Sequence, residues 1–447
     1  MLKIFDWIVL LLFGEKLGFD ELQFSYQNNC NTAMCTWLVI ESTDYFTRNG
    51  SNVYSCFMDM RKAFDLVKHS ILFKKLRERE LSPIFLRLII IMYINQKANV
   101  RWGSSYSGYF NVTNGVKQGA VLSAVLFCVY IDGLITILRR KKTGCWIKKC
   151  FMGIAVHADD IVLLSPSIDG LQEMIDTCSE YSGDHNLSFS TNEDPAKSKT
   201  KCLVFSCNKK ANKEEPARKM LLNGKPLPWV KSVKHLGVKL NDELERGQDT
   251  LEKRAQYISK CNELRQEFHF AAPETITFLN RTYNTHFYGT ELWDLFSGEA
   301  GRITGTWNTT QRIVFGLPRT AHRYLVEPIS QEVHIMKLLQ KRFLKFARSI
   351  KNSTKPVLRS VFGQIQRDCQ SVTGRNLRSI MLETKHDTFT NFDLHFDWKT
   401  SYYKIPKEET WRVDLIEVLL DTKRGKRTIN NFAVEDIDDM LTYAAVT

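Results

Sequence analysis

Two adjacent aspartates inside an apolar stretch, residues 154–164 (IAVHADDIVLL), constrain this chain most. Asp159 and Asp160 lie between two runs of β-forming residues, a pattern typical of two strands joined by a tight turn. Adjacent carboxylates repel each other, and apolar surroundings favour neither charge. An isolated Asp-Asp pair is most often a solvated turn, so other residues must decide whether this pair has a function.

A third aspartate ends another strand-like segment, residues 53–60 (VYSCFMDM), at Asp59. If these strands are neighbours in one sheet, three carboxylates converge at one edge, and a cation is needed to relieve their repulsion. Oxygen ligands without nearby His or Cys favour Mg²⁺ or Mn²⁺. Two such ions, about 3.5–4 Å apart, can activate the attacking oxygen and stabilise the leaving oxygen of a phosphoryl transfer. Side chains alternate along a strand, so we expect Asp159 to be the main ligand and Asp160 to be peripheral.

The rest of the chain predicts an α+β fold. Clustered strands with helices packed on one side favour this class over a doubly wound sheet. The pattern predicts a helix over residues 65–80 with Asp65 as N-cap, followed by a hairpin over 97–113 with a GSSYSG turn. The remaining predicted elements are a buried helix over 120–138, a surface helix over 167–187, hairpin segments over 221–240, and helices beyond about 245.

Composition bounds the function only loosely. The 447 residues are 43% hydrophobic, which predicts a globular chain of roughly two to four domains. The formal net charge of +13 is compatible with a polyanionic partner but does not require one. Basic runs lie at residues 139–149 and 197–219, and the second is predicted to be a solvated loop.

The amino-terminal stretch MLKIFDWIVLLLFGEKLG is predicted to be a buried helix. Asp6 interrupts the apolar run, which is too short to span a bilayer and lacks a small-residue cleavage site. The eleven cysteines include three pairs with C-x4-C spacing, which is not a zinc pattern, so free thiols are expected. We therefore expect an intracellular protein of nucleus or cytoplasm, not secreted and with no membrane partner.

Five ordered blocks resemble the reverse transcriptases of non-LTR (LINE-type) retrotransposons. The blocks are residues 57–76, 114–134, 157–164, 199–205 and 233–240. The family pattern F-x-D-x-x-K-A-F-D is matched at every fixed position by the block that contains Asp59. The Gln-Gly block is matched at Gly115, Gln118, Gly119, Ser123, Leu126 and Phe127.

The resemblance implies a right-hand polymerase: a palm with partial fingers and a helical thumb and C-terminal region. The implied divisions are a residual fingers segment (1–50), a palm with a fingers hairpin and a primer-grip hairpin (51–240), a thumb-like helical region (241–345), and a C-terminal helical region of unknown role (346–447). The implied activity is RNA-directed DNA polymerisation. The implied partners are an RNA template, a DNA primer and dNTPs.

The resemblance also implies individual roles. Asp59 and Asp159 would bind Mg²⁺ (or Mn²⁺), with Asp160 beside them, and Lys199 would act as general acid on the pyrophosphate. Phe64 would lie under the sugar and exclude a 2′-hydroxyl, whereas on helical spacing alone it is a core residue. The other implied contacts are the nucleotide pocket (Gln118, Gly119), the primer grip (His235, Leu236, Gly237) and nucleic-acid contacts (Arg139, Arg140, Lys141, Lys142).

The sequence departs from the family pattern at several places. His157 replaces the usual aromatic before Ala-Asp-Asp. An imidazole there can still stack near the primer end, but a protonated one would oppose metal binding. Ala124 replaces a common proline. Upstream, Gln27 occupies a usually basic position, and Ser25 and Tyr26 replace Gly and Phe. The early blocks of the family are missing, which predicts an amino-terminally truncated chain. Three hypotheses stay open: an active polymerase, a silent remnant that binds RNA or RNA–DNA hybrid, and a degenerate copy without a cellular role.

Overall fold

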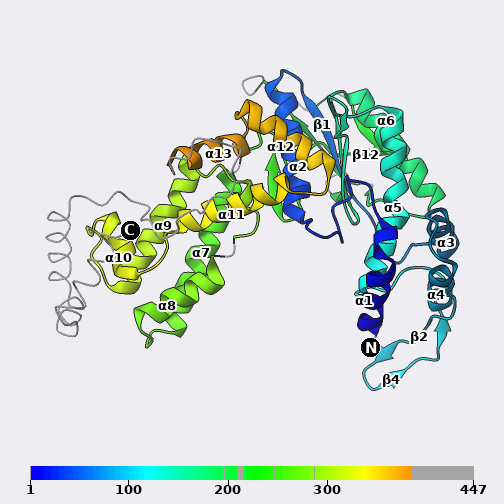
Figure 1. The fold of residues 1–447 in the computed structure, drawn as a ribbon, viewed down its shortest axis with the longest axis horizontal. Coiled ribbons are helices and arrows are strands. Elements are labelled where there is room, and N and C mark those ends of the chain that lie inside the picture. The colour runs from blue at the N-terminus through cyan, green and yellow to red at the C-terminus, as the bar shows by residue number, and fades with distance from the viewer. Residues whose placement is uncertain are drawn as a thin grey trace. The chain divides into compact units, whose positions relative to one another are not determined.

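The computed structural model describes residues 2–383, except 193, 195–196, 209–215, 217, 246 and 286. The chain divides into two compact units. Unit 1 comprises Met1–Glu245 and Asn352–Gly363, and unit 2 comprises Arg246–Lys351 and the chain from Gln364 onward. Each unit is described by itself (Figure 1).

A four-stranded antiparallel sheet forms the centre of unit 1. Its strands are β1 (Val53–Asp59), β8 (Ile154–His157), β9 (Asp160–Ser165) and β10 (Lys201–Phe205), in the order β10-β1-β9-β8. The apolar residues of β8 and β9 are buried, as expected of strands covered by helices. The prediction that the segments carrying the aspartates are neighbours in one sheet is confirmed.

Three helices build the core around this sheet. Helix α2 (Thr32–Arg48), capped by Asn31, contacts β8, β1 and β9, and α6 (Ile168–Asp184), capped by Ser167, contacts β9 and β1. Helix α5 (Val121–Lys141) contacts α6, and its predicted burial is confirmed. Among the described helices, α5 alone is apolar and long enough to cross a membrane, and most of that stretch is buried, as in the core helix of a soluble protein.

The amino-terminal helix differs from its prediction. Helix α1 (Leu2–Phe13) forms, but among its residues 3–13 only Val9 and Asp6 are buried, while Trp7 and Leu11 are 63% and 85% exposed. The prediction of a buried helix was therefore wrong. Hydrophobicity alone cannot decide burial, because α1 contacts α5 and its Phe13 packs on Phe85 of α4, while several of its apolar side chains stay exposed.

Two other local predictions need correction. Helix α3 (His69–Glu78) begins four residues after Asp65, which is therefore not its N-cap. Residues 61–66 form a turn instead, because the amides of Gly115 and Val116 donate to the carbonyls of Val67 and Phe64, both at 2.8 Å. The predicted hairpin at 97–113 is present, but its turn is only Gly103–Ser104, since Trp102 pairs with Ser105.

The hairpin follows a short apolar helix, α4 (Pro83–Ile94), capped by Ser82. In Figure 1 it extends away from the sheet beyond α3 and α4. The remaining small elements of unit 1 are η1 (Gly14–Leu17), β2 (Lys97–Ala98), β3 (Arg101–Trp102), β4 (Ser105–Tyr106), β5 (Phe110–Asn111), β6 (Trp146–Ile147), β7 (Cys150–Phe151), β11 (Met220–Leu222), β12 (Lys225–Leu227), β13 (Ser232–His235) and β14 (Val238–Asn241).

In its described residues, unit 2 is helical, as predicted for the chain beyond about 245. Trp293 is buried in its core, and its Nε1 donates to Oδ2 of Asp249 at 2.7 Å. Residues 384–447, most of the predicted C-terminal region, lie outside the described residues. The elements are α7 (Gly247–Glu267), α8 (Pro273–Leu279), η3 (Asn280–Asn284), η4 (Thr290–Leu292), α9 (Gly298–Phe315), η5 (Arg323–Leu325), α10 (Val326–Ser330), α11 (Ile335–Lys351), α12 (Pro356–Asp368, whose first residues belong to unit 1) and α13 (Val372–Glu383).

Candidate active site

The register of the β1–β9 pair brings two of the three aspartates together. Asp59, the last residue of β1, lies directly opposite Asp160, the first residue of β9. Directly opposed residues of an antiparallel pair present their side chains to the same face of the sheet. The expectation that Asp160 is peripheral rested on strand alternation alone. The register places Asp160, rather than Asp159, across from Asp59.

Asp159 lies in the loop that joins β8 to β9. His157 pairs with Asp160, which leaves Ala158 and Asp159 as a two-residue hairpin loop. Ala158 has a φ of +57°, in the left-handed region that disfavours residues with a Cβ. The loop therefore needs support from outside its own backbone to keep this conformation.

The three carboxylates influence one another electrostatically. The pKa of Asp160 is raised to about 6, first by burial and then by the negative charges of Asp159 and Asp59. The pKa of His157 is lowered, mainly by burial. Burial therefore disfavours the protonated imidazole that would oppose a cation.

Lys199 lies beside the first aspartate. Its Nζ is 3.8 Å from Oδ2 of Asp59, and the lysine side chain is 73% exposed. The amide of Asp59 also donates to Oγ1 of Thr200 at 3.3 Å, which fixes the end of β1 against the segment that leads into β10. The ammonium group is thus next to a carboxylate and open to solvent, where a charged ligand can reach it.

Phe64 and the Gln-Gly block meet in space although about fifty residues separate them. The Phe64 ring is half-buried and stacks on Phe127 of α5, with centroids 5.0 Å apart. Nε2 of Gln118 donates to Oδ1 of Asp65 at 3.0 Å. A Cβ on Gly115 would lie 3.0 Å from the Asp65 carbonyl oxygen, so only glycine allows this approach.

The loop that contains Gly119 is exposed. Gly119 has a φ of +83°, and nothing lies within 4 Å of where its Cβ would be. The space beside Gly119 is therefore open. Whether a nucleotide or the template occupies it stays a prediction.

The predicted primer-grip residues divide between core and turn. His235 is buried at the end of β13, with Nδ1 3.1 Å from Oγ1 of Thr36 and its ring against Phe57. Burial lowers the pKa of His235 to about 3. Leu236 and Gly237 form the two-residue turn to β14, with φ values of +45° and +82°. A contact with a primer would therefore come from the turn, and His235 would support it from below.

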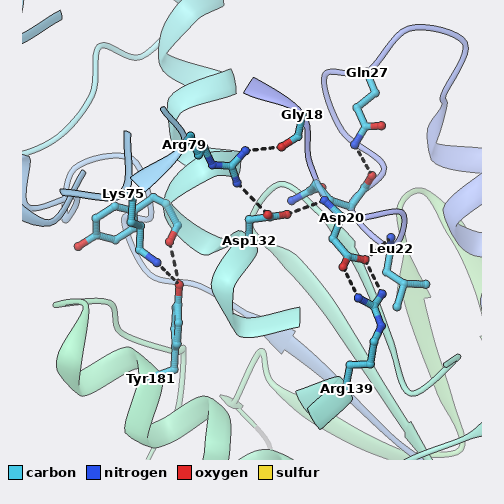
Figure 2. Close-up of polar contacts among 11 residues, drawn as sticks. Gly18, Asp20, Leu22, Gln27, Lys75, Arg79, Asp132, Arg139 and Tyr181 are labelled. Atoms are coloured by element: carbon cyan, nitrogen blue, oxygen red, sulfur yellow. Dashed lines mark hydrogen bonds and ion pairs between the residues drawn. The ribbon is translucent and has the colours of Figure 1, made fainter. Parts of the chain in front are cut away.

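The half-buried Arg139 is paired with a carboxylate of the same unit. Figure 2 shows its guanidinium facing Asp20, with donor–acceptor distances of 2.5 and 2.7 Å. The Asp20 amide donates to Asp132, whose other oxygen accepts from Arg79 at 2.8 Å. The predicted nucleic-acid contact of this basic run therefore depends on the exposed Arg140, Lys141 and Lys142.

Sequence reasoning missed two polar residues that support the aspartate loop. The Ala158 amide donates to Oγ of Ser25 at 2.9 Å and to Oε1 of Gln23 at 3.3 Å. Both side chains are buried. Gln27 also turns toward this segment, since its Nε2 donates to the Gln23 carbonyl at 2.8 Å. The available signal was the uncharged polar pair Gln23 and Ser25 in QFSYQ, of which Ser25 was interpreted only as a departure from the family pattern.

The donor chemistry of the site suits Mg²⁺ or Mn²⁺, since all three candidate ligands are carboxylates whose charges oppose one another. Among the described residues, no three His, Cys, Asp or Glu side chains form a group that could already hold a metal ion. Asp59 faces Lys199 instead. Asp59, Asp159 and Asp160 are thus candidate ligands by position and chemistry.

Comparison with known proteins decides the family. Residues 4–240, more than half of the chain, match the family model "Reverse transcriptase (RNA-dependent DNA polymerase)". The chain belongs to the reverse transcriptase family. The matched residues include the whole four-stranded sheet, so the α+β polymerase fold expected from the sequence is confirmed.

Relatives of this reverse transcriptase come from retrotransposons. It is 28% identical over 194 residues to a polyprotein of the R2 element of Nasonia vitripennis, covering 42% of this chain and 18% of that protein. It is 24% identical to a probable RNA-directed DNA polymerase of the Drosophila melanogaster X-element, covering 66% of this chain and 32% of that protein. The resemblance to LINE-type enzymes is confirmed. The chain spans less than a third of the length of these relatives.

Solved structures similar to this reverse transcriptase include telomerases. The apo telomerase of Candida tropicalis is 12% identical, with a TM-score of 0.41 over 88% of this chain and 61% of that chain. The telomerase of Candida albicans in complex with an RNA fragment is 11% identical, with a TM-score of 0.40 over 83% of this chain and 54% of that chain.

Proposed function

We propose that this chain is an RNA-directed DNA polymerase that extends a DNA 3′ end with dNTPs on an RNA template. The observation that carries the proposal is the β1–β9 register, which sets Asp59 opposite Asp160 and next to the loop that carries Asp159. Family membership supports the reaction class, and the carboxylate group supports the chemistry.

In the proposed reaction, the 3′-hydroxyl oxygen attacks the α-phosphorus of a dNTP and the bond to pyrophosphate breaks. Asp59, Asp159 and Asp160 would hold Mg²⁺ or Mn²⁺, which when bound lowers the pKa of the attacking hydroxyl and neutralises phosphate charge. Lys199, which is exposed and close to Asp59, would donate a proton to the departing pyrophosphate oxygen.

Other residues would choose and place the substrates. Phe64, fixed by its stack on Phe127, would lie against the sugar and reject a 2′-hydroxyl. Gln118 and Gly119 would line the nucleotide and template pocket, and the Leu236–Gly237 turn would contact the primer end. The helical unit 2 would serve as the thumb, and Arg140, Lys141 and Lys142 would contact phosphates.

A silent remnant that binds RNA or RNA–DNA hybrid is the second candidate. One observation favours it. The Gln27 side chain bonds within its own segment, at a position where the resembled family carries a basic residue for the triphosphate.

Primer extension separates the two candidates. The purified chain is given a DNA primer on an RNA template with Mg²⁺ and dNTPs, beside a paired Asp59→Asn, Asp159→Asn variant, and primer–template binding is measured in parallel. The polymerase proposal predicts extension that the variant loses while it still binds the duplex. Binding without extension by the folded wild-type chain would overturn the polymerase proposal and leave the remnant.

A further inference from the structure

A buried lysine near the end of the described chain donates hydrogen bonds to the backbone of the segment that contains Gln23. Lys355 is only 4% exposed, and its Nζ donates to the carbonyl oxygens of Gln23 at 2.8 Å and Glu21 at 3.1 Å. The ammonium also lies 5.1 Å from the centroid of the Phe24 ring. The amide of Val357 adds a bond to Oε2 of Glu21 at 2.8 Å.

Residues 21–25, the segment that Lys355 contacts, lie along β8, the edge strand of the sheet. The Phe24 amide donates to the Val156 carbonyl at 2.8 Å, and the Val156 amide donates to the Leu22 carbonyl at 2.9 Å. These two bonds make Gln23 a parallel bridge partner of Val156 in β8. Whatever holds residues 21–25 in place therefore also holds the end of β8.

Two side chains of the segment continue to the aspartate loop. Oγ of Ser25 donates to Oε1 of Gln23 at 2.8 Å, and both oxygens accept from the Ala158 amide. Ala158 is the residue with left-handed backbone, and Asp159 follows it directly. The resembled family commonly carries glycine where this chain has Ser25, so the hydroxyl bond is a feature of this chain itself.

The same segment is held at its start by one ion pair and two hydrogen bonds to its backbone. The Arg139 guanidinium pairs with the Asp20 carboxylate, the Asp20 amide donates to Asp132, and Arg79 donates to the Gly18 carbonyl (Figure 2). These contacts anchor residues 18–20 to α5 and to Arg79, the residue that follows α3. Lys355 acts further along, at the residues that reach the loop.

We propose that Gln23, Ser25 and Lys355 are positioning residues that hold the Ala158 turn and so present Asp159 and Asp160 toward Asp59. The chain of contacts runs from the segment after α11, through residues 21–25, to the loop between β8 and β9. The catalytic consequence rests on the proposed polymerase function, whereas the positioning itself does not.

Hydrogen–deuterium exchange of the full chain tests the positioning directly. The variants are Lys355→Met, which keeps the aliphatic stem and loses the donors, and Ser25→Ala. The matched control is Lys75→Met, because Lys75 is another largely buried lysine of unit 1 whose Nζ donates to Oη of Tyr181 instead. Melting temperatures identify variants that fail to fold.

The proposal predicts at least tenfold faster exchange of the Val156 and Ala158 amides in Lys355→Met and Ser25→Ala, and wild-type rates in Lys75→Met. The proposal also predicts that Lys355→Met and Ser25→Ala bind Mn²⁺ at least fivefold more weakly, as measured by electron paramagnetic resonance. Both variants should have a lower kcat with little change in the KM for dNTP. Unchanged exchange in folded Ser25→Ala, or an equal increase in Lys75→Met, would overturn it. A wild-type chain that extends no primer would overturn the polymerase proposal, and the exchange rates would still decide the positioning.

Discussion

Asp59 and Asp160 are opposed residues at the ends of β1 and β9, so the backbone ladder of the sheet itself brings their carboxylates to one face. Their proximity follows from the pairing of the two strands and does not depend on the conformation of a loop. The third carboxylate, Asp159, depends on a strained two-residue loop and on the side chains that hold it. Strand pairing therefore positions Asp59 and Asp160, whereas side chains from outside the loop position Asp159.

Lys199 is predicted to act on the leaving group. Lys199→Met should lower kcat for nucleotide addition by about 10²-fold or more, the usual effect of removing a general acid, with a smaller effect on the KM for dNTP. Lys197→Met is a matched control, because Lys197 is equally exposed and pairs with Asp194 instead. Single-turnover extension measures both, and equal rates for the two variants would contradict the assignment.

Phe64 is predicted to select deoxynucleotides. Phe64→Ala should reduce the preference for dNTP over rNTP by about tenfold or more, since the ring that blocks the 2′-hydroxyl is lost. Phe73→Ala, a half-buried aromatic of α3 that contacts His69, is the control for a general loss of packing. The measurement is the ratio of kcat/KM for the two substrates. An unchanged ratio in Phe64→Ala would refute the role.

His235 is predicted to make unit 1 sensitive to acid. Its pKa of about 3 is below the ordinary value of 6.5, so below pH 6.5 the unfolded state binds a proton that the folded state does not. This contribution to stability is complete above pH 6.5 and is lost as the pH falls toward 3, by about 1.4 kcal/mol per pH unit.

Urea unfolding of the wild-type and His235→Gln chains at several pH values checks this prediction. Hydrogen exchange of unit 1 amides reports the unfolding of that unit. Glutamine does not titrate and can still bond Thr36. The two free energies of unfolding should change in parallel between pH 7 and 8 and diverge below 6.5. Parallel curves down to pH 5 would show that His235 is not held neutral.

Arg139 and Arg140 are neighbours, but they are predicted to serve different properties: Arg139 the stability of unit 1 and Arg140 the binding of RNA. Arg139→Ala should destabilise unit 1 by about 1–3 kcal/mol, because it leaves Asp20 without its charged partner. Arg140→Ala should leave stability unchanged and weaken RNA binding, with a smaller salt dependence. Thermal melting and binding at two salt concentrations test the pair, and the reverse pattern would contradict both assignments.

The sequence predicted the parts of the fold that depend on local pattern. The strand that ends at Asp59, the buried helix α5 and the hairpin that carries Asp159 and Asp160 all follow from local runs of β-forming or apolar residues, and each is present. The predicted start of α3 was wrong. The turn at residues 61–66 is fixed by hydrogen bonds from the backbone amides of Gly115 and Val116, which a local sequence pattern cannot reveal.

The contacts of Arg139 and Lys355 could not be predicted for a related reason. Both are residue types that usually lie on the surface, and their partners at Asp20 and Gln23 are more than one hundred residues away. The Ser25 bond to Ala158 was missed because a motif comparison treats a replacement only as a loss. In the structure the new hydroxyl supplies an acceptor.

Asp59 and Asp160 are proposed to act together in nucleotidyl transfer. The most direct test is single-nucleotide incorporation on an RNA template with Mg²⁺ by the wild-type chain and by Asp59→Asn, Asp160→Asn and Asp44→Asn variants. Asp44, which pairs with Arg48 on the surface of α2, is the control carboxylate. We expect the incorporation rate to fall by about 10²-fold or more in both site variants and to stay unchanged in the control. Wild-type rates in folded Asp160→Asn would contradict it.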